Sequence, residues 1–369
     1  MKRFIFIGLF VSFCGFLRAQ ETEQQAEIKY YGMDYFLIEG TNIPDSEKES
    51  PYDRLPSSYK EKVRAPVWNL SKNSAGITVR FLSNSSKIKA KWSVLNNNKM
   101  NHMAESGIKG VDLYFKNRGQ WQYVNTGRPS GVDNEAVLVS NMTERMREYK
   151  LFLPLYDGVT SLEIGVDENS LIIKPEPLDE KPIVFYGTSI TQGGCASRPG
   201  MVHTSIISRA LDVDVINFGF SGNGKMETEL LELISDIDAA FYVIDCLPNM
   251  NSKEVEERTI PLVDLIRTKH PDTPIIFVEN LIYEKAFLDT NYRLEIEEKN
   301  QVLENQYKEL TYRGDENVMY IKNDDAMGGS HEGTVDGIHL TDLGFQLFAD
   351  YLIEKFKNFG LIKLIVGSK

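Results

Sequence analysis

The second half of the chain alternates short apolar segments with amphipathic stretches, and this alternation limits the possible folds more than any other feature. Helical patterns separate the apolar segments, and the clearest are a charged one at 294–312 and the last one at 341–356. Asn251, followed three residues later by Glu254, matches a helix capping box. The five segments, rich in β-branched and aromatic residues, are 183–186, 213–218, 240–245, 275–279 and 318–321. This order predicts a parallel sheet with helices on both faces and active groups at the carboxyl ends of its strands.

The first half has a different pattern, because apolar and polar residues alternate there with a period of two and without clear helices between the segments. We expect an antiparallel β-sandwich over residues 20–176, although 20–75 show little periodicity. The alternating segments are 77–81, 88–92, 111–115, 121–124, 149–153 and 160–166. Asp157-Gly158 predicts a hairpin turn between the last two. A proline-rich stretch at 175–182 separates this domain from a second domain at 177–369.

Residues 1–19 have the features of a secretory signal peptide. Lys2 and Arg3 precede a short apolar run, and Ala19 offers a small residue for cleavage. We therefore expect an exported protein, periplasmic or extracellular. Removing 1–19 takes away three of the 41 basic residues and none of the 53 acidic ones, which leaves a net charge of −15. This charge argues against nucleic acid as a partner, and without another long apolar run no stable membrane insertion is expected.

Several groups suited to ester chemistry follow the predicted strands. Ser189 stands just after Gly187 at the end of the first strand, and Asp336 stands three residues before His339, a spacing at which a carboxylate can orient an imidazole base. A glycine-rich loop containing Gly222 and the side chain of Asn249 could bind an oxyanion. Each group also has an ordinary structural role, since serine and asparagine cap helices and glycine-rich loops are common turns.

Alternatives remain open for the base and for the two cysteines. His203 and His331 are rivals of His339 among the five histidines. No histidine or cysteine spacing is typical of a metal site, so no metal and no other cofactor is expected. Cys195 and Cys246 could form one disulfide bond or remain two buried thiols.

The segments that contain Ser189, Gly222, Asn249 and Asp336–His339 resemble, in this order, the four motif blocks of SGNH (GDSL-like) hydrolases. Those enzymes have a three-layer α/β/α fold similar to flavodoxin. The resemblance implies that Ser189 is the nucleophile, His339 the base and Asp336 its orienting carboxylate. It also implies an oxyanion hole made by the backbone N–H groups of Ser189 and Gly222 and by the side chain of Asn249. The chain has Gly-Thr-Ser at 187–189 where the family has Gly-Asp-Ser.

Residues 110–114, Gly-Val-Asp-Leu-Tyr, match the G-x-D-L-Y signature of an N-terminal domain found in one branch of these enzymes. This resemblance implies an exported serine esterase that removes short acyl (acetyl) groups from carbohydrate. The alternatives are a non-catalytic glycan-binding protein and a lipid or thioester acylhydrolase. Trp92 and Trp121 could bind glycan or fill the core of the sandwich. The sequence assigns no oligomeric state.

Overall fold

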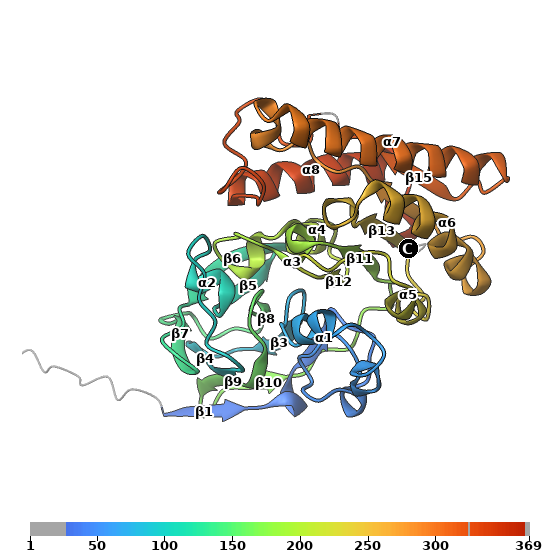
Figure 1. Ribbon diagram of the computed structural model, residues 1–369. Coiled ribbons are helices and arrows are strands. Elements are labelled where there is room, and N and C mark those ends of the chain that lie inside the picture. Colours follow the sequence, from blue (N-terminus) through green and yellow to red (C-terminus); the bar gives the residue numbers. More distant parts are fainter. Residues whose placement is uncertain (1–26, 324, 366–369) are drawn as a thin grey trace, which may run out of the picture.

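A five-stranded parallel sheet organises the second half of the chain (Figure 1). The computed structural model describes residues 27–323 and 325–365, so the proposed signal peptide lies outside the described residues. The strands are β11 (Ile183–Gly187), β12 (Val215–Gly219), β13 (Phe241–Asp245), β14 (Ile275–Val278) and β15 (Val318–Ile321). Their spatial order is β12-β11-β13-β14-β15, which confirms the flavodoxin-like topology. Since β11 lies between β12 and β13, the topological switch point is at its carboxyl end.

Helices cover both faces of this sheet, as expected. Apolar residues of α4 (His203–Leu211) and α8 (Asp342–Asn358) pack on one face. The other face packs against α5 (Thr228–Ile234), α6 (Ser252–Lys269) and most of α7 (Thr290–Tyr312). The capping box at Asn251 and Glu254 is present at the start of α6, and the side chain of Thr341 caps α8. Of the described residues, none forms a helix long and apolar enough to cross a lipid bilayer.

The first half forms two antiparallel sheets with an apolar core between them, which confirms the predicted sandwich. One sheet has the order β1-β9-β4-β7, from β1 (Ile28–Tyr31), β4 (Ile88–Val94), β7 (Asp133–Val139) and β9 (Val159–Asp167). The other has the order β10-β3-β8-β5-β6, with β2 paired to β3. Its strands are β2 (Leu37–Glu39), β3 (Thr78–Ser83), β5 (Val111–Asn117), β6 (Gln120–Gly127), β8 (Arg147–Phe152) and β10 (Ile172–Ile173). The short helices are α1 (Ala65–Ser71), α2 (Glu105–Ile108), α3 (Ser189–Gln192) and α9 (Ile362–Ile365).

The hairpin predicted at Asp157-Gly158 is wrong, because β8 and β9 lie in different sheets. The buried carboxylate of Asp157 accepts hydrogen bonds from the backbone N–H groups of Asn96, Asn98 and Gly158. A Cβ atom on Gly158 would lie 2.3 Å from the carbonyl oxygen of Lys72, so the glycine permits a close backbone contact instead of a hairpin turn. The segment crosses between the two sheets.

Residues 40–75, which lack periodicity, pack largely against the parallel sheet. Val67 and Trp68 of α1 belong to the apolar cluster that covers β11, β12 and β13. The buried Arg54 guanidinium donates to the carbonyl oxygens of Asn217 and Gly219 on β12, at 3.2 and 2.6 Å. The N-terminal segment therefore supplies part of the layer that supports the strand ends.

Candidate active site

Ser189 lies at the switch point, immediately after β11. A Cβ atom on Gly187 would stand 2.0 Å from Oγ1 of Thr191, so only glycine lets the strand turn directly into α3. The side chain of Thr188 accepts a hydrogen bond from the backbone N–H of Ile190, and Thr188 is thus the N-cap of α3. This capping by Thr188 leaves the Ser189 hydroxyl available for another partner.

The partner of Ser189 is His339. Its Nε2 atom lies 3.0 Å from Oγ of Ser189, and its Nδ1 atom lies 2.8 Å from Oδ2 of Asp336. The other carboxylate oxygen of Asp336 accepts from the backbone N–H groups of Ile338 and His339, at 3.1 and 2.8 Å. Gly337 has a φ of +86°, the left-handed conformation that closes this turn. The structure therefore brings the three predicted triad residues into one hydrogen-bonded chain, across a gap of 150 residues.

The hydrogen bonds around Asp336 favour its ionised form. Partial burial raises the pKa of its carboxyl group, but the hydrogen bonds from the side chain and backbone of His339 outweigh that effect. The pKa of Asp336 is consequently held below its ordinary value. A carboxylate that stays charged can hold the Nδ1 proton of His339 and direct Nε2 toward the serine.

Gly222, in the loop after β12, and Asn249, at the end of the 3-10 turn Leu247–Asn249, are linked by hydrogen bonds to the nucleophile turn. The Phe220 N–H donates to the carbonyl oxygen of Gly187 at 3.0 Å, and Nδ2 of Asn249 donates to the carbonyl oxygen of Phe220 at 3.2 Å. Gly222 has a φ of +69°, and among the described residues its N–H has no acceptor. Asn249 does not cap a helix, since Asn251 fills that role for α6. These two donors are thus connected to Ser189 through neighbouring backbone groups.

The sandwich also reaches the site, a feature that the sequence did not reveal. The hydroxyl of Tyr156, which follows β8, donates to the carbonyl oxygen of Ser189 at 3.3 Å. His102, in the loop after β4, has its ring centre 5.9 Å from that of His339. These residues lie far from the motif blocks in sequence, and Tyr156 and His102 have no pattern of their own that could have marked them.

The two rival histidines do not contact Ser189. His203 is completely buried among Phe185, Phe345 and Phe348, and neither of its ring nitrogens has a hydrogen-bond partner. Burial lowers its pKa to about 3. His331 instead contacts Glu284 through Nδ1 at 3.0 Å. His339 is the histidine that the fold places on the serine.

Cys195 and Cys246 are both buried free thiols, which decides between the two possibilities that the sequence left open. Cys195 lies three residues after α3, with a φ of +74°. Burial, with a smaller contribution from the charge of Asp336, raises the pKa of the Cys195 thiol to about 12.

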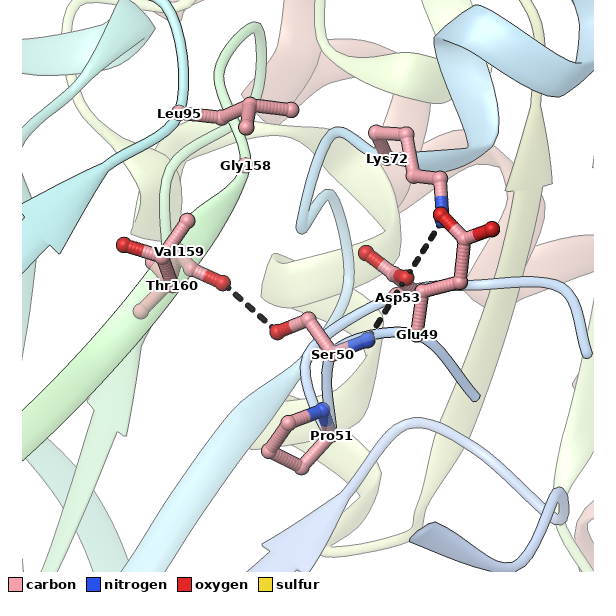
Figure 2. Close-up of a pocket in the computed structure, with 9 residues that line it drawn as sticks. All are labelled: Glu49, Ser50, Pro51, Asp53, Lys72, Leu95, Gly158, Val159 and Thr160. Atoms are coloured by element: carbon pink, nitrogen blue, oxygen red, sulfur yellow. Dashed lines mark hydrogen bonds and ion pairs between the residues drawn. The ribbon is translucent and has the colours of Figure 1, made fainter. Parts of the chain in front are cut away.

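A cavity of about 280 Å³ lies at the junction of the N-terminal segment and the sandwich, and it contains no triad residue (Figure 2). Lys72 forms ion pairs there with Glu49 and Asp53, each at 2.8 Å, and Oγ of Ser50 donates to the carbonyl oxygen of Val159. The charged groups at this cavity are thus paired with one another.

Comparisons with known proteins agree with this arrangement. Residues 180–357 match the model of the GDSL-like lipase/acylhydrolase family, and residues 28–172 match that of the N-terminus of SGNH-hydrolase-type esterases. A solved structure from Bacteroides ovatus, described as a GDSL-like lipase, has 39% sequence identity and a TM-score of 0.86. The alignment covers 91% of this chain and 98% of that one. The chain belongs to the GDSL-like lipase/acylhydrolase family.

Two more distant structures share the fold of this ester hydrolase. The salicylyl-acyltransferase SsfX3 from a tetracycline biosynthetic pathway has a TM-score of 0.76 at 15% identity, with 90% of this chain and 98% of that one covered. A family two carbohydrate esterase from Cellvibrio japonicus has a TM-score of 0.59 at 12% identity, with 92% and 99% covered. No curated protein matches the sequence.

The two tryptophans of the sandwich have structural partners in this esterase. Trp92 is buried, and its Nε1 donates to the carbonyl oxygen of Lys109. The Nε1 of Trp121 donates at 2.7 Å to the carboxylate of Asp212, which follows α4, so this ring contacts the second half of the chain. Trp92 therefore fills the core of the sandwich, as one of the two alternatives predicts, whereas Trp121 is only partly buried and lies outside that core.

Proposed function

We propose that Ser189, His339 and Asp336 are the catalytic triad of this ester hydrolase and that its substrate is a short acyl (acetyl) ester on carbohydrate. The observation that carries the proposal is the continuous hydrogen-bonded chain from Asp336 through His339 to Ser189. This chain has the geometry that general-base activation of a serine requires. It also disfavours a purely glycan-binding role, which would not need it.

In the acylation step, Oγ of Ser189 attacks the ester carbonyl while Nε2 of His339 takes its proton. Asp336 stabilises the imidazolium that forms. The N–H groups of Ser189 and Gly222 and the amide of Asn249 donate to the oxyanion of the tetrahedral intermediate, and one such donor typically lowers the barrier by about 3 kcal/mol. His339 then protonates the departing alcohol. Water, deprotonated by His339, releases the acid and regenerates the Ser189 hydroxyl.

The openness of the triad supports an ester carried on a bulky polar molecule. The side chains of His339 and Asp336 are 24% and 36% exposed. An ester group on a polysaccharide can approach such a surface site, whereas a long acyl chain would need a buried apolar channel to favour binding. The loop that brings His102 to the site also carries the exposed Asn96 and Asn101, whose amides can hydrogen-bond to sugar hydroxyls.

Export is part of the same proposal, because polymeric carbohydrate lies outside the cytoplasm. It is supported by the signal-peptide features of residues 1–19. Cell fractionation with an antibody, compared with a variant that lacks residues 2–19, tests it. Equal cytoplasmic retention of both forms would contradict export.

The substrate is tested by measuring acetate release from acetylated xylan, mannan, pectin and sialoglycans. Ser189→Ala serves as the blank in every reaction. We expect release from at least one of these polymers, together with a preference for p-nitrophenyl acetate over p-nitrophenyl decanoate. A preference for the long-chain ester without acetate release from any polymer would instead support a lipid acylhydrolase.

A further inference from the structure

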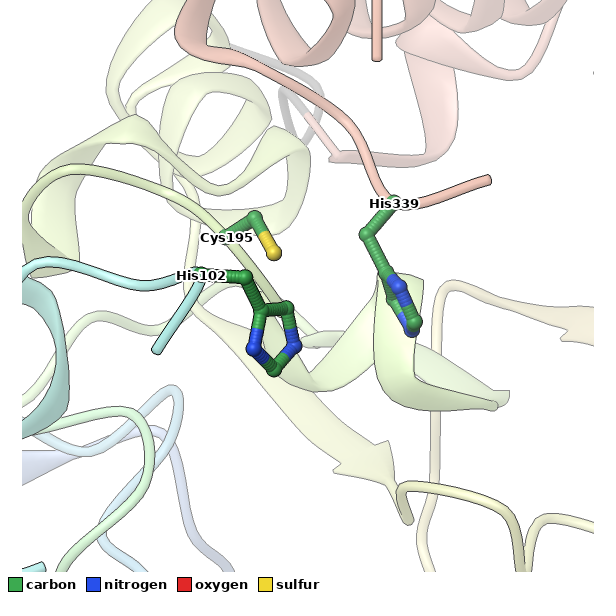
Figure 3. Close-up of side chains that lie close together, drawn as sticks. All are labelled: His102, Cys195 and His339. Carbon is green, nitrogen blue, oxygen red and sulfur yellow. The ribbon is translucent and has the colours of Figure 1, made fainter. Parts of the chain in front are cut away.

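Three side chains of types that bind metals, from separate parts of the chain, meet at the proposed triad, to which one of them belongs (Figure 3). They are His102 from the loop after β4, Cys195 from the turn after α3, and His339 from the segment before α8. One ligand atom from each lies within 4.8 Å of the other two. Figure 3 shows the side chains of Cys195 and His102 next to each other, with the ring of His339 facing them across a gap. No spacing within the sequence could have indicated this group, because the three residues are far apart in the chain.

Two imidazole nitrogens and one sulfur are a ligand set that suits Zn²⁺. Zinc sites with three protein ligands keep a fourth position for water, with a Zn–N distance of about 2.1 Å and a Zn–S distance of about 2.3 Å. Such bond lengths place the ligand atoms about 3.5 Å apart, so the group must contract by roughly 1 Å. The exposed His102 ring hydrogen-bonds to the adjacent Asn101 side chain, and it can turn toward an ion without disturbing the core.

Asp336 adds a feature of metal sites that the three ligands alone would lack. Histidines that bind metal usually donate their other ring N–H to a carboxylate, which fixes the ring and increases its basicity. His339 has this arrangement, since Nδ1 faces Oδ2 of Asp336 at 2.8 Å and leaves Nε2 for another partner. Nε2 is also the atom that contacts Oγ of Ser189. An ion on Nε2 and the serine hydroxyl therefore compete for one lone pair.

We propose that His102, Cys195 and His339 bind one Zn²⁺ ion and that this ion reversibly inhibits the esterase by occupying Nε2 of the catalytic base. Binding forms two Zn–N bonds and one Zn–S bond, and the Cys195 thiol releases its proton to solvent. The inhibitory part rests on the proposed role of His339, whereas the binding part rests on the three side chains alone.

Binding is measured by calorimetric titration of ZnCl₂ into the purified protein, prepared without a histidine tag and freed of metal by a chelator. Co²⁺ serves as a spectroscopic probe, because a cobalt–thiolate bond adds a charge-transfer absorption in the near ultraviolet. We expect one Zn²⁺ per chain and a cobalt spectrum with the thiolate band. His102→Ala and Cys195→Ser should each weaken Zn²⁺ binding by more than about tenfold. Loss of a residue that only hydrogen-bonds to a metal ligand already weakens binding by at least that factor, and these two variants each remove a ligand.

His331→Ala is the matched control, because His331 is an exposed histidine that pairs with Glu284 elsewhere. It should bind Zn²⁺ like the unaltered protein. His102→Ala also covers the case in which Cys195→Ser fails to fold, since His102 is exposed. Absence of binding in the unaltered protein, or equal binding in all three variants, would overturn the metal site and leave the esterase assignment intact.

Inhibition is measured as hydrolysis of p-nitrophenyl acetate with and without Zn²⁺, each variant being compared with its own rate in chelator. The unaltered protein should lose activity and regain it when chelator is added, and His102→Ala should resist inhibition. Ser189→Ala should still bind Zn²⁺ in calorimetry. Binding without inhibition would overturn the inhibitory part and leave the esterase assignment intact.

Discussion

The buried Asp112 and the partly buried Arg198 form an ion pair that joins the sandwich to the segment following α3. Oδ2 of Asp112 lies 2.8 Å from Nη1 of Arg198 and accepts the N–H of Gly200 at the same distance. The hydroxyl of Tyr114 accepts a second hydrogen bond from Arg198 at 2.7 Å. Asp112 and Tyr114 are the aspartate and tyrosine of the G-x-D-L-Y signature, whose contacts thus hold the sandwich to the catalytic half of the chain.

Replacing Asp112 with asparagine should lower the free energy of unfolding by about 3 kcal/mol, because removal of one charge leaves Arg198 without its partner. Denaturant unfolding measures the change. Asp238→Asn is the control, since the Asp238–Lys181 pair is exposed and should contribute under about 1 kcal/mol. Equal losses in the two variants would show that the signature pair is not a structural link.

His203 should make the protein sensitive to acid. Its pKa is about 3 in the folded protein against an ordinary value of 6.5, so the unfolded state binds the proton first as the pH falls. Protonation of His203 therefore does not reduce the free energy of unfolding above pH 6.5, and it reduces this energy progressively as the pH falls from 6.5 toward 3. His203→Leu should reduce this loss and should add about 1 kcal/mol or more at neutral pH, since both ring nitrogens lack partners. Parallel pH–stability curves for the two proteins would contradict this explanation.

Asp245 should have the opposite pH dependence. Burial raises its pKa to about 7, despite a hydrogen bond from Thr191, so the unfolded state loses its proton first as the pH rises. This group therefore lowers stability increasingly from pH 3.8 to about 7. Asp245→Asn keeps an acceptor for Thr191 and should gain more stability at pH 8 than at pH 4.5 in denaturant unfolding. An equal change at both values would show that Asp245 is not protonated in the fold.

Asn249 tests the proposed oxyanion hole. Asn249→Ala should reduce kcat for p-nitrophenyl acetate by about 10²–10³-fold with little change in KM, because the amide acts mainly on the developing oxyanion. Stopped assays at saturating substrate measure kcat. The control is Asn251→Ala, which removes the cap of α6 and should cost about 1 kcal/mol of stability while activity is retained. A higher KM with an unchanged kcat for Asn249→Ala would assign the residue to substrate binding.

The sequence predicted most accurately those elements whose signals are local. All five strands of the parallel sheet were found within two residues at each end, since each is a continuous apolar segment. The capping box of α6 and the Asp336–His339 turn were also recognisable, because their residues interact over three positions.

The remaining features depend on contacts between distant segments. α1 and Arg54 support the parallel sheet from the N-terminal segment, and a sequence pattern does not record which sheet a helix covers. Asp157-Gly158 resembles a hairpin turn, but its conformation is set by contacts with residues 96, 98 and 72. His102 and Tyr156 lie near Ser189 and His339 because the sandwich packs against the second half of the chain.

The central claim is that Ser189 is the nucleophile activated by His339, and the most direct measurement is kcat/KM of Ser189→Ala for p-nitrophenyl acetate. Circular dichroism confirms that the variant remains folded. We predict that hydrolysis falls to the background rate, because no hydroxyl remains to attack the ester. Activity close to that of the unaltered protein would contradict the claim.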